Sequence, residues 1–250
     1  MVFKSFMRAF GVGGPTIDAV LDTDKVVPGG IVTGTLHVRG GEQGRTATRA
    51  VLDVVARVKR KSGDDEYETD EVIAGHEISG PIPLGGETSA PFRIELPPFT
   101  PVTSLGGRNF VWVRSNLDIP MQIDPADTDK LDVYPTQAQI NVLEAMNLLG
   151  FHLYKVDIDP RSSWFGRSWV QEFEFRPGGG HRRGRFDEVE IVFEQVHGNH
   201  VELLMQLDRR ARGLGGFLAE MTGMDESWVR VSLDASTPQA AAAILQRTLG

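Results

Sequence analysis

The chain has 250 residues, of which 40% are hydrophobic and 24% charged, so the composition is that of a soluble globular protein and argues against disorder of the whole chain. The formal net charge is -8, with 26 Lys and Arg against 34 Asp and Glu, and a nucleic-acid-binding surface is therefore not expected. There is no cysteine, which excludes disulfides, thiolate metal sites and cysteine nucleophiles.

From about residue 16 to 133, apolar and polar side chains alternate in short runs separated by Gly, Pro and Asp, which is the pattern of β-strands. The runs are Ile17–Leu21, Ile31–Val38, Ala50–Val58, Glu71–Ile78, Pro91–Leu96, Phe110–Ser115 and Leu131–Val133. In the third run every second residue from Ala50 to Val58 is apolar, which suits a strand packed against an opposing sheet. Seven short strands predict a β-sandwich.

A turn and a close contact are predicted near the start of this domain. Pro28-Gly29 precedes the second strand run, and this dipeptide favours a tight turn. Gly34 lies inside the run, where a glycine indicates that another part of the chain approaches the backbone closely.

A helix is predicted over residues 136–150. Thr136 and Gln139 have the spacing of a capping box, an apolar stripe follows, and Gly150 is a typical terminator. Strand runs then return in Phe151–Ile158, Trp169–Arg176, Glu188–Val196, His200–Leu207 and Trp228–Leu233. Thr237 and Pro238 predict the start of a C-terminal helix that extends to residue 249.

Several motifs, in this order and spacing, resemble the bacterial sporulation-control family of stage-zero control protein M. They are Leu96-Pro97-Pro98-Phe99-Thr100-Pro101-Val102-Thr103, Val111-Trp112-Val113-Arg114, Leu117-Asp118-Ile119, Asp124-Pro125, Val133 with Pro135, and Gln171-Glu172-Phe173-Glu174-Phe175. The resemblance implies an all-β protein with two arrestin-like β-sandwich domains, at residues 1–135 and 151–250, joined by the helix at 136–150. It also implies a regulatory or adaptor protein of a bacterial developmental or stress pathway that acts through protein–protein interaction and not as an enzyme.

Four carboxylates, at Asp124, Asp127, Asp129 and Asp132, lie within nine residues. Oxygen ligands of this kind suit a hard cation such as Ca²⁺, but the spacing is not that of an EF-hand. We interpret them as turn caps before the strand at Leu131, and a cation site remains the alternative.

Other candidate sites are weaker. His197 and His200 flank Gly-Asn, which predicts a hairpin turn more readily than a metal site. Basic clusters at residues 59–61 and 181–185 are expected at hairpin tips, and the second could also contact an acidic partner. No catalytic motif occurs, so no catalytic, cofactor-binding or metal-binding residue is assigned and no cofactor is expected.

The N-terminal segment carries an apolar stripe. Phe3, Phe6, Met7 and Phe10 have helical spacing, with cationic residues off the stripe. We expect this face to pack on the first sandwich as a lid, or to dock on an unidentified protein partner or a membrane surface. A membrane-peripheral structural protein held by this segment is therefore one alternative function. A metal-dependent hydrolase is a separate alternative, and homodimerisation through sandwich edges is left open. Without a signal-peptide pattern in this segment, a cytoplasmic location is expected.

Overall fold

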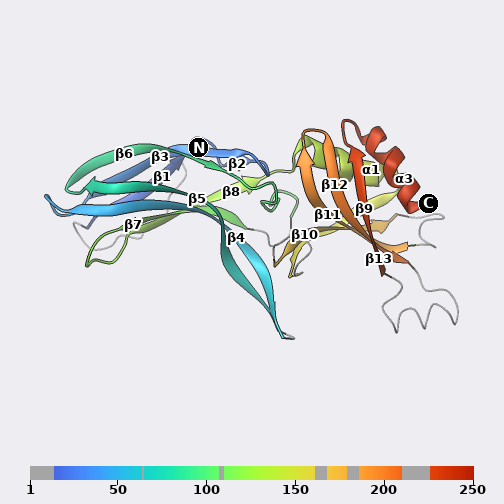
Figure 1. The fold of residues 1–250 in the computed structure, drawn as a ribbon, viewed down its shortest axis with the longest axis horizontal. Coiled ribbons are helices and arrows are strands. Elements are labelled where there is room, and N and C mark those ends of the chain that lie inside the picture. The colour runs from blue at the N-terminus through green and yellow to red at the C-terminus, as the bar shows by residue number, and fades with distance from the viewer. Residues whose placement is uncertain (1–13, 64, 107–109, 161–167, 179–185, 210–225) are drawn as a thin grey trace. The chain divides into compact units, whose positions relative to one another are not determined.

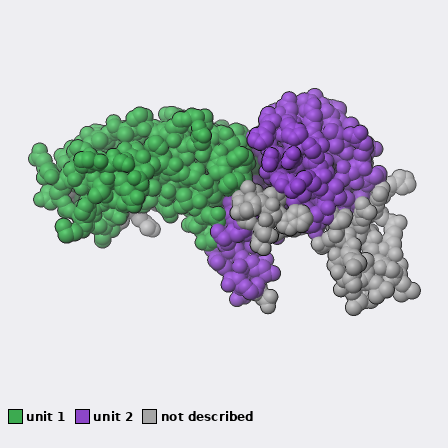
Figure 2. Space-filling view, viewed as in Figure 1, with its two compact units in different colours: residues 1–57, 69–104, 109–134 green, residues 58–68, 105–108, 135–250 purple. Residues whose placement is uncertain are grey.

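The structure is a computed structural model that describes residues 14–63, 65–106, 110–160, 168–178, 186–209 and 226–250. The chain divides into two compact units, coloured separately in Figure 2. Unit 1 comprises residues 1–57, 69–104 and 109–134, and unit 2 comprises residues 58–68, 105–108 and 135–250. Each unit is described separately below.

Unit 1 consists of two β-sheets (Figure 1). The three-stranded antiparallel sheet has the order β1 (Thr16–Leu21), β3 (Ile31–Gly40) and β6 (Gly86–Glu95). The five-stranded sheet has the order β2 (Lys25–Val26), β8 (Ala126–Val133), β7 (Val111–Asp118), β4 (Thr46–Ser62) and β5 (Asp65–Pro83), whose distal β4–β5 end belongs to unit 2. Strand β1 of the first sheet contacts β7 and β8 of the second, so the sheets pack face to face as a sandwich.

The core of unit 1 follows the predicted alternation. Every second residue of β4 from Ala50 to Ala56 is fully buried. On the other sheet, Val32, Leu36 and Ile94 are at most 2% exposed and form the opposite side of the core. Strands β4, β5 and β8 are longer than the predicted runs, because their ends carry polar residues and lack the apolar face on which the prediction depends.

The turn and the close approach predicted at residues 28–34 are both present. Gly29 has φ +72°, and the Gly30 amide donates to the Val27 carbonyl 2.9 Å away. A Cβ at Gly34 would overlap the Val20 carbonyl oxygen, so only glycine allows β1 to pair this closely with β3.

The described strands of unit 2 that follow residue 135 form one five-stranded antiparallel sheet. Its order is β13 (Glu226–Asp234), β12 (His200–Arg209), β11 (Phe186–His197), β10 (Val170–Pro177) and β9 (Phe151–Asp159). Helices α1 (Gln137–Leu148) and α3 (Pro238–Leu249) contact each other and the sheet, and they cover one of its faces (Figure 1). With strands dominating both units, the all-β prediction is confirmed.

Helix α1 lies within the predicted range, and the predicted Thr136 is its N-cap. The Gln139 amide donates to Thr136 Oγ1 and the Thr136 amide to Gln139 Oε1, which completes the capping box. Gly150, with φ +83°, follows the C-terminus. At the start of α3, the side chain of Thr237 accepts from the Ala240 amide, so this helix is also capped at the predicted residue.

Candidate functional site

An open groove of about 510 Å³ lies on the outer face of the five-stranded sheet of unit 1. Side chains from β4, β5, β7 and β8 line it, together with the residue that precedes β7. The lining residues are Arg57, Asp70, Phe110, Val111, Trp112, Arg114, Thr128 and Lys130. Three of them are cations and one is an anion, so we call this feature the cationic groove.

Each cation of the groove is held by a carboxylate. Arg57 Nε donates to Asp70 Oδ1 at 3.0 Å, and its Nη2 lies 3.4 Å from Oδ2. Arg114 Nη2 donates to Oδ2 of Asp53 at 2.9 Å, and Asp53 lies on β4 directly opposite Arg114. Fixed guanidinium groups lose little conformational entropy when they bind a ligand.

Lys130 is the most exposed of the three cations. Its ammonium lies 2.6 Å from Asp132 Oδ1, and 67% of its side chain is exposed. An ammonium has three N–H donors, and Asp132 accepts from one of them. Lys130 therefore has the capacity to donate to a ligand without leaving Asp132.

Trp112 and Phe110 are the aromatic side chains of the groove, and Trp112 lies at its centre on the sheet. It lies on β7 directly opposite Lys130 on β8 and opposite Val55 on β4. The Arg57 guanidinium carbon is 5.4 Å from the indole ring centre, within the range of a cation–π interaction. Partly exposed Trp and Arg side chains in a concave setting are the types that dominate binding energy at protein interfaces.

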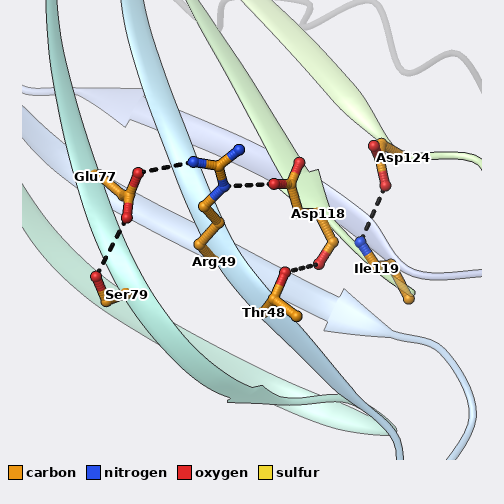
Figure 3. A network of polar contacts seen from close by, with 7 residues as sticks. All are labelled: Thr48, Arg49, Glu77, Ser79, Asp118, Ile119 and Asp124. Atoms are coloured by element: carbon orange, nitrogen blue, oxygen red, sulfur yellow. Dashed lines mark hydrogen bonds and ion pairs between the residues drawn. The ribbon is translucent and has the colours of Figure 1, made fainter.

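A polar network continues along the same strands to the end of the sandwich (Figure 3). Arg49 on β4 donates to Asp118 on β7 at 2.5 Å and to Glu77 on β5 at 3.0 Å. Asp118, and next Glu77, raise the pKa of Arg49 above its usual value through these hydrogen bonds. The Thr48 hydroxyl donates to the Asp118 carbonyl, so three neighbouring strands are tied together at this point.

The loop after β7 presents two apolar side chains to solvent. Met121 has φ +60° and is 99% exposed, and Ile123 is 78% exposed. The loop backbone is fixed on both sides of Met121, because Arg45 donates to the Pro120 carbonyl at 2.7 Å and Asp124 accepts from the Ile119 amide at 3.0 Å. A non-glycine residue held in the left-handed region of φ and ψ marks a constrained loop.

A carboxyl cluster lies between the sheets of unit 1. Asp127 and Asp129 lie two residues apart on the same face of β8, and both interact with Asp18 of β1. Burial, followed by the charges of Asp127 and Asp18, raises the pKa of Asp129 to about 7. Burial also raises the pKa of Asp127, although that carboxylate accepts hydrogen bonds from the Thr128 and Ala19 amides. The cluster therefore holds a proton near neutral pH.

The four aspartates predicted as turn caps are separated by the structure. Asp124 is a turn cap, as expected, through its bond to Ile119. Asp127 and Asp129 are instead strand residues that point inward, because β8 begins at Ala126 and not near Leu131. Asp132 faces outward to Lys130. Among the residues that the structure describes, no three His, Asp or Glu side chains are grouped to hold a metal ion.

The remaining predicted features are placed as follows. His197 and His200 end β11 and begin β12 around a two-residue turn with Gly198 at φ +59°, as predicted for a hairpin. Phe3, Phe6, Met7 and Phe10 lie outside the described residues, as does the basic cluster at 181–185. Within the described ranges, no helix has the length and apolar character needed to span a bilayer.

The sequence did not indicate the cationic groove. Its cations come from β4, β7 and β8, and Arg57 and Lys130 lie on strands that are far apart in the chain. A signal was present in the alternation at β7, where Phe110, Trp112 and Arg114 share the outward face. Two of these side chains are large and aromatic at positions where a solvated sheet face usually carries small polar residues.

Comparison with known proteins places the chain in a family. The family model described as SpoOM protein matches residues 3–211. The sporulation-control protein spo0M of Bacillus subtilis (strain 168) is 35% identical over 238 residues, which cover 94% of this chain and 91% of the relative. The crystal structure of Spo0M from Bacillus subtilis matches with a TM-score of 0.81 and 34% identity, covering 95% of this chain and 98% of that one. The chain therefore belongs to the Spo0M family of sporulation-control proteins.

Proposed function

We propose that this chain is a non-enzymatic regulatory protein of a sporulation-type pathway, and that it acts as an adaptor by binding a protein partner. The relative at 35% identity is a sporulation-control protein, which supports the regulatory role. The binding mode is inferred from the surface of unit 1. We further propose a cytoplasmic location, in keeping with a sequence that contains no cysteine.

The cationic groove is the observation that carries this proposal. It is concave, has a volume within the range of ligand sites, and combines two aromatic side chains with three charged donors. Its donors are ordered by ion pairs and lie on β-strands, so the surface is preorganised for binding. The lining consists of cations, apolar side chains, one threonine and one aspartate that Arg57 already engages, a set that suits recognition better than catalysis.

A second binding mode rests on the sequence alone. The apolar stripe Phe3, Phe6, Met7 and Phe10 would suit a partner groove or a membrane surface. This mode does not exclude the first, since the stripe and the groove belong to different segments of the chain. Pairing of two copies through strand edges also remains a proposal, because the edges β5 and β13 are long.

Site-specific photo-crosslinking in sporulating Bacillus subtilis cells that express this chain tests the proposal. A photoreactive residue replaces Thr128, which is exposed in the groove, and in a control chain it replaces Ser89, which is exposed on β6 of the other sheet. We expect a discrete protein adduct from position 128 that is absent from position 89 and is reduced by Lys130→Glu. Equal adducts from both positions, or none from position 128, would contradict partner binding at the groove.

A further inference from the structure

We propose that the cationic groove binds an acidic peptide segment of its partner in an extended conformation. This inference rests on the proposed function, because it names the chemistry of the partner at the same site. The proposed peptide carries two carboxylates spaced two residues apart and an apolar side chain next to them.

The charge of the groove contrasts with that of the chain. Arg57, Arg114 and Lys130 accompany Asp70 in the lining, and the carboxylates paired with the other two cations are not among the lining residues. The lining itself thus presents three cations and one carboxylate, in a protein whose net charge is -8, while Asp53 and Asp132 balance the other two cations from outside the lining. Short-range attraction favours an anionic ligand, whereas a long polyanion would also meet the acidic remainder of the surface. A short acidic segment satisfies both conditions better than a nucleic acid or an extended anionic membrane.

The positions of the cations match the repeat of an extended chain. Lys130 is opposite Trp112, and Arg114 lies two residues farther along β7, so the Lys130 and Arg114 side chains are diagonal neighbours. Diagonal neighbours of a sheet are about 7 to 8 Å apart. Side chains on one face of an extended peptide repeat about every 6.6 to 6.8 Å. The side chains at positions i and i+2 of an extended peptide therefore have about the same spacing as the residue positions of Lys130 and Arg114 on the sheet.

The aromatic side chains of the groove offer a contact for an apolar side chain of the peptide, in addition to the two carboxylate contacts. Phe110, Trp112 and Arg114 share the outer face at β7 at intervals of two residues, and 44% of Phe110 is exposed. A ligand side chain two residues beyond the carboxylates would lie near these rings. An apolar residue there would bury aromatic surface, while the guanidinium of Arg114 is suited to a planar carboxylate.

Calorimetric titration of the full chain with a synthetic peptide tests the inference. The probe is a peptide of about ten residues of Gly, Ser and Thr, with Glu at two positions two apart and Phe two positions farther on, so that it matches the repeat of the groove. Its controls carry Gln or Lys in place of both Glu residues. We expect the Glu peptide to bind, the Gln peptide to bind about tenfold more weakly or worse, the Lys peptide not to bind, and affinity to fall as salt is added.

Matched variants assign the binding to the groove. Lys130→Gln and Arg114→Gln should each lower the affinity for the Glu peptide about fivefold or more. Arg93→Gln should have no effect, although Arg93 resembles Lys130 in pairing with an acid two residues along an outward strand face, here Glu95 at 3.1 Å. Because Lys130 is largely exposed, its variant tests the inference even if loss of the Arg114–Asp53 pair unfolds unit 1.

Some outcomes would overturn the inference. These are equal affinity for the Glu and Gln peptides, an unaltered affinity in Lys130→Gln, and displacement of the peptide by vesicles of anionic phospholipid at lower charge concentration. Mass spectrometry of the adduct at position 128 separates the two proposals. A captured partner segment without acidic residues would refute the acidic ligand and leave adaptor function in place, whereas the absence of any adduct would refute both.

Discussion

Asn141, buried on helix α1, donates a hydrogen bond from Nδ2 to the backbone carbonyl of Ala235, 2.7 Å away and just before helix α3. The two residues are 94 positions apart. Because Ala235 is fully buried, this bond joins both helices of unit 2 at a position where water does not reach the carbonyl.

Replacing Asn141 by Ala should lower the free energy of unfolding of unit 2 by about 1 to 3 kcal/mol. The change leaves a buried carbonyl without its donor, and the desolvation cost of that group is of this size. Urea denaturation followed by circular dichroism measures the effect, and hydrogen exchange should rise in α1 and α3. The control is Asn147→Ala on the exposed side of the same helix, where the side chain bonds only at the surface and the expected change is within about 0.5 kcal/mol. Equal effects of the two variants would contradict the role of the buried bond.

Replacing Asp129 by Asn should stabilise unit 1 at pH 8, and by clearly less at pH 5. The folded-state pKa of Asp129 is about 7, above the value of about 3.9 expected in the unfolded chain. Between these two pKa values the folded state binds more protons than the unfolded state, so the free energy of unfolding falls as pH rises. The stability that comes from protonated Asp129 is lost once pH has risen through about 7. With allowance for partial exposure, we expect a gain of about 1 to 2 kcal/mol at pH 8.

Denaturation of both chains at pH 5 and pH 8 checks this expectation. Asp132→Asn serves as the control, since Asp132 lies on the same strand but faces outward to Lys130. A benefit of Asp129→Asn that is the same at both pH values would show that the buried cluster does not hold a proton near neutrality.

Replacing Gly34 by Ala should destabilise unit 1 by about 2 to 4 kcal/mol. The added methyl would overlap the Val20 carbonyl oxygen and lie 2.8 Å from the Phe92 ring, so β1 and β3 would have to separate. Gly86→Ala is the matched control on β6, because no atom lies within 4 Å of its added methyl. If thermal unfolding shows the same midpoint for both variants, the close approach at Gly34 does not limit the stability of unit 1.

Local features were predictable from the sequence because short-range physics determines them. The Thr136–Gln139 capping box, the turn at Gly29 and the buried face of β4 all depend on residues within a few positions of one another. The inward direction of Asp127 and Asp129 followed from the same alternation, yet their spacing with Asp124 suggested turn caps.

Features that join distant strands were not predictable in this way. Asp18 meets Asp127 only because β1 packs across from β8, and Lys130 meets Trp112 only through the register of β7 and β8. A shift of one residue in that register would place Lys130 beside an inward-facing side chain and remove the groove. Pairing and register therefore decide the candidate site, and a single sequence does not specify them.

The apolar stripe near the N-terminus leads to a prediction from the sequence. If Phe3, Phe6, Met7 and Phe10 dock on a partner or membrane, each buried large side chain contributes roughly 1.5 to 3 kcal/mol. Phe6→Asp with Phe10→Asp should then weaken association in liposome co-sedimentation and in the crosslinking assay by about tenfold or more, while the unfolding transition stays unchanged. Ser5→Asp with Ala9→Asp adds the same charge on the opposite helical face and should preserve association. Equal association of both double variants would leave the stripe as a cap on its own chain.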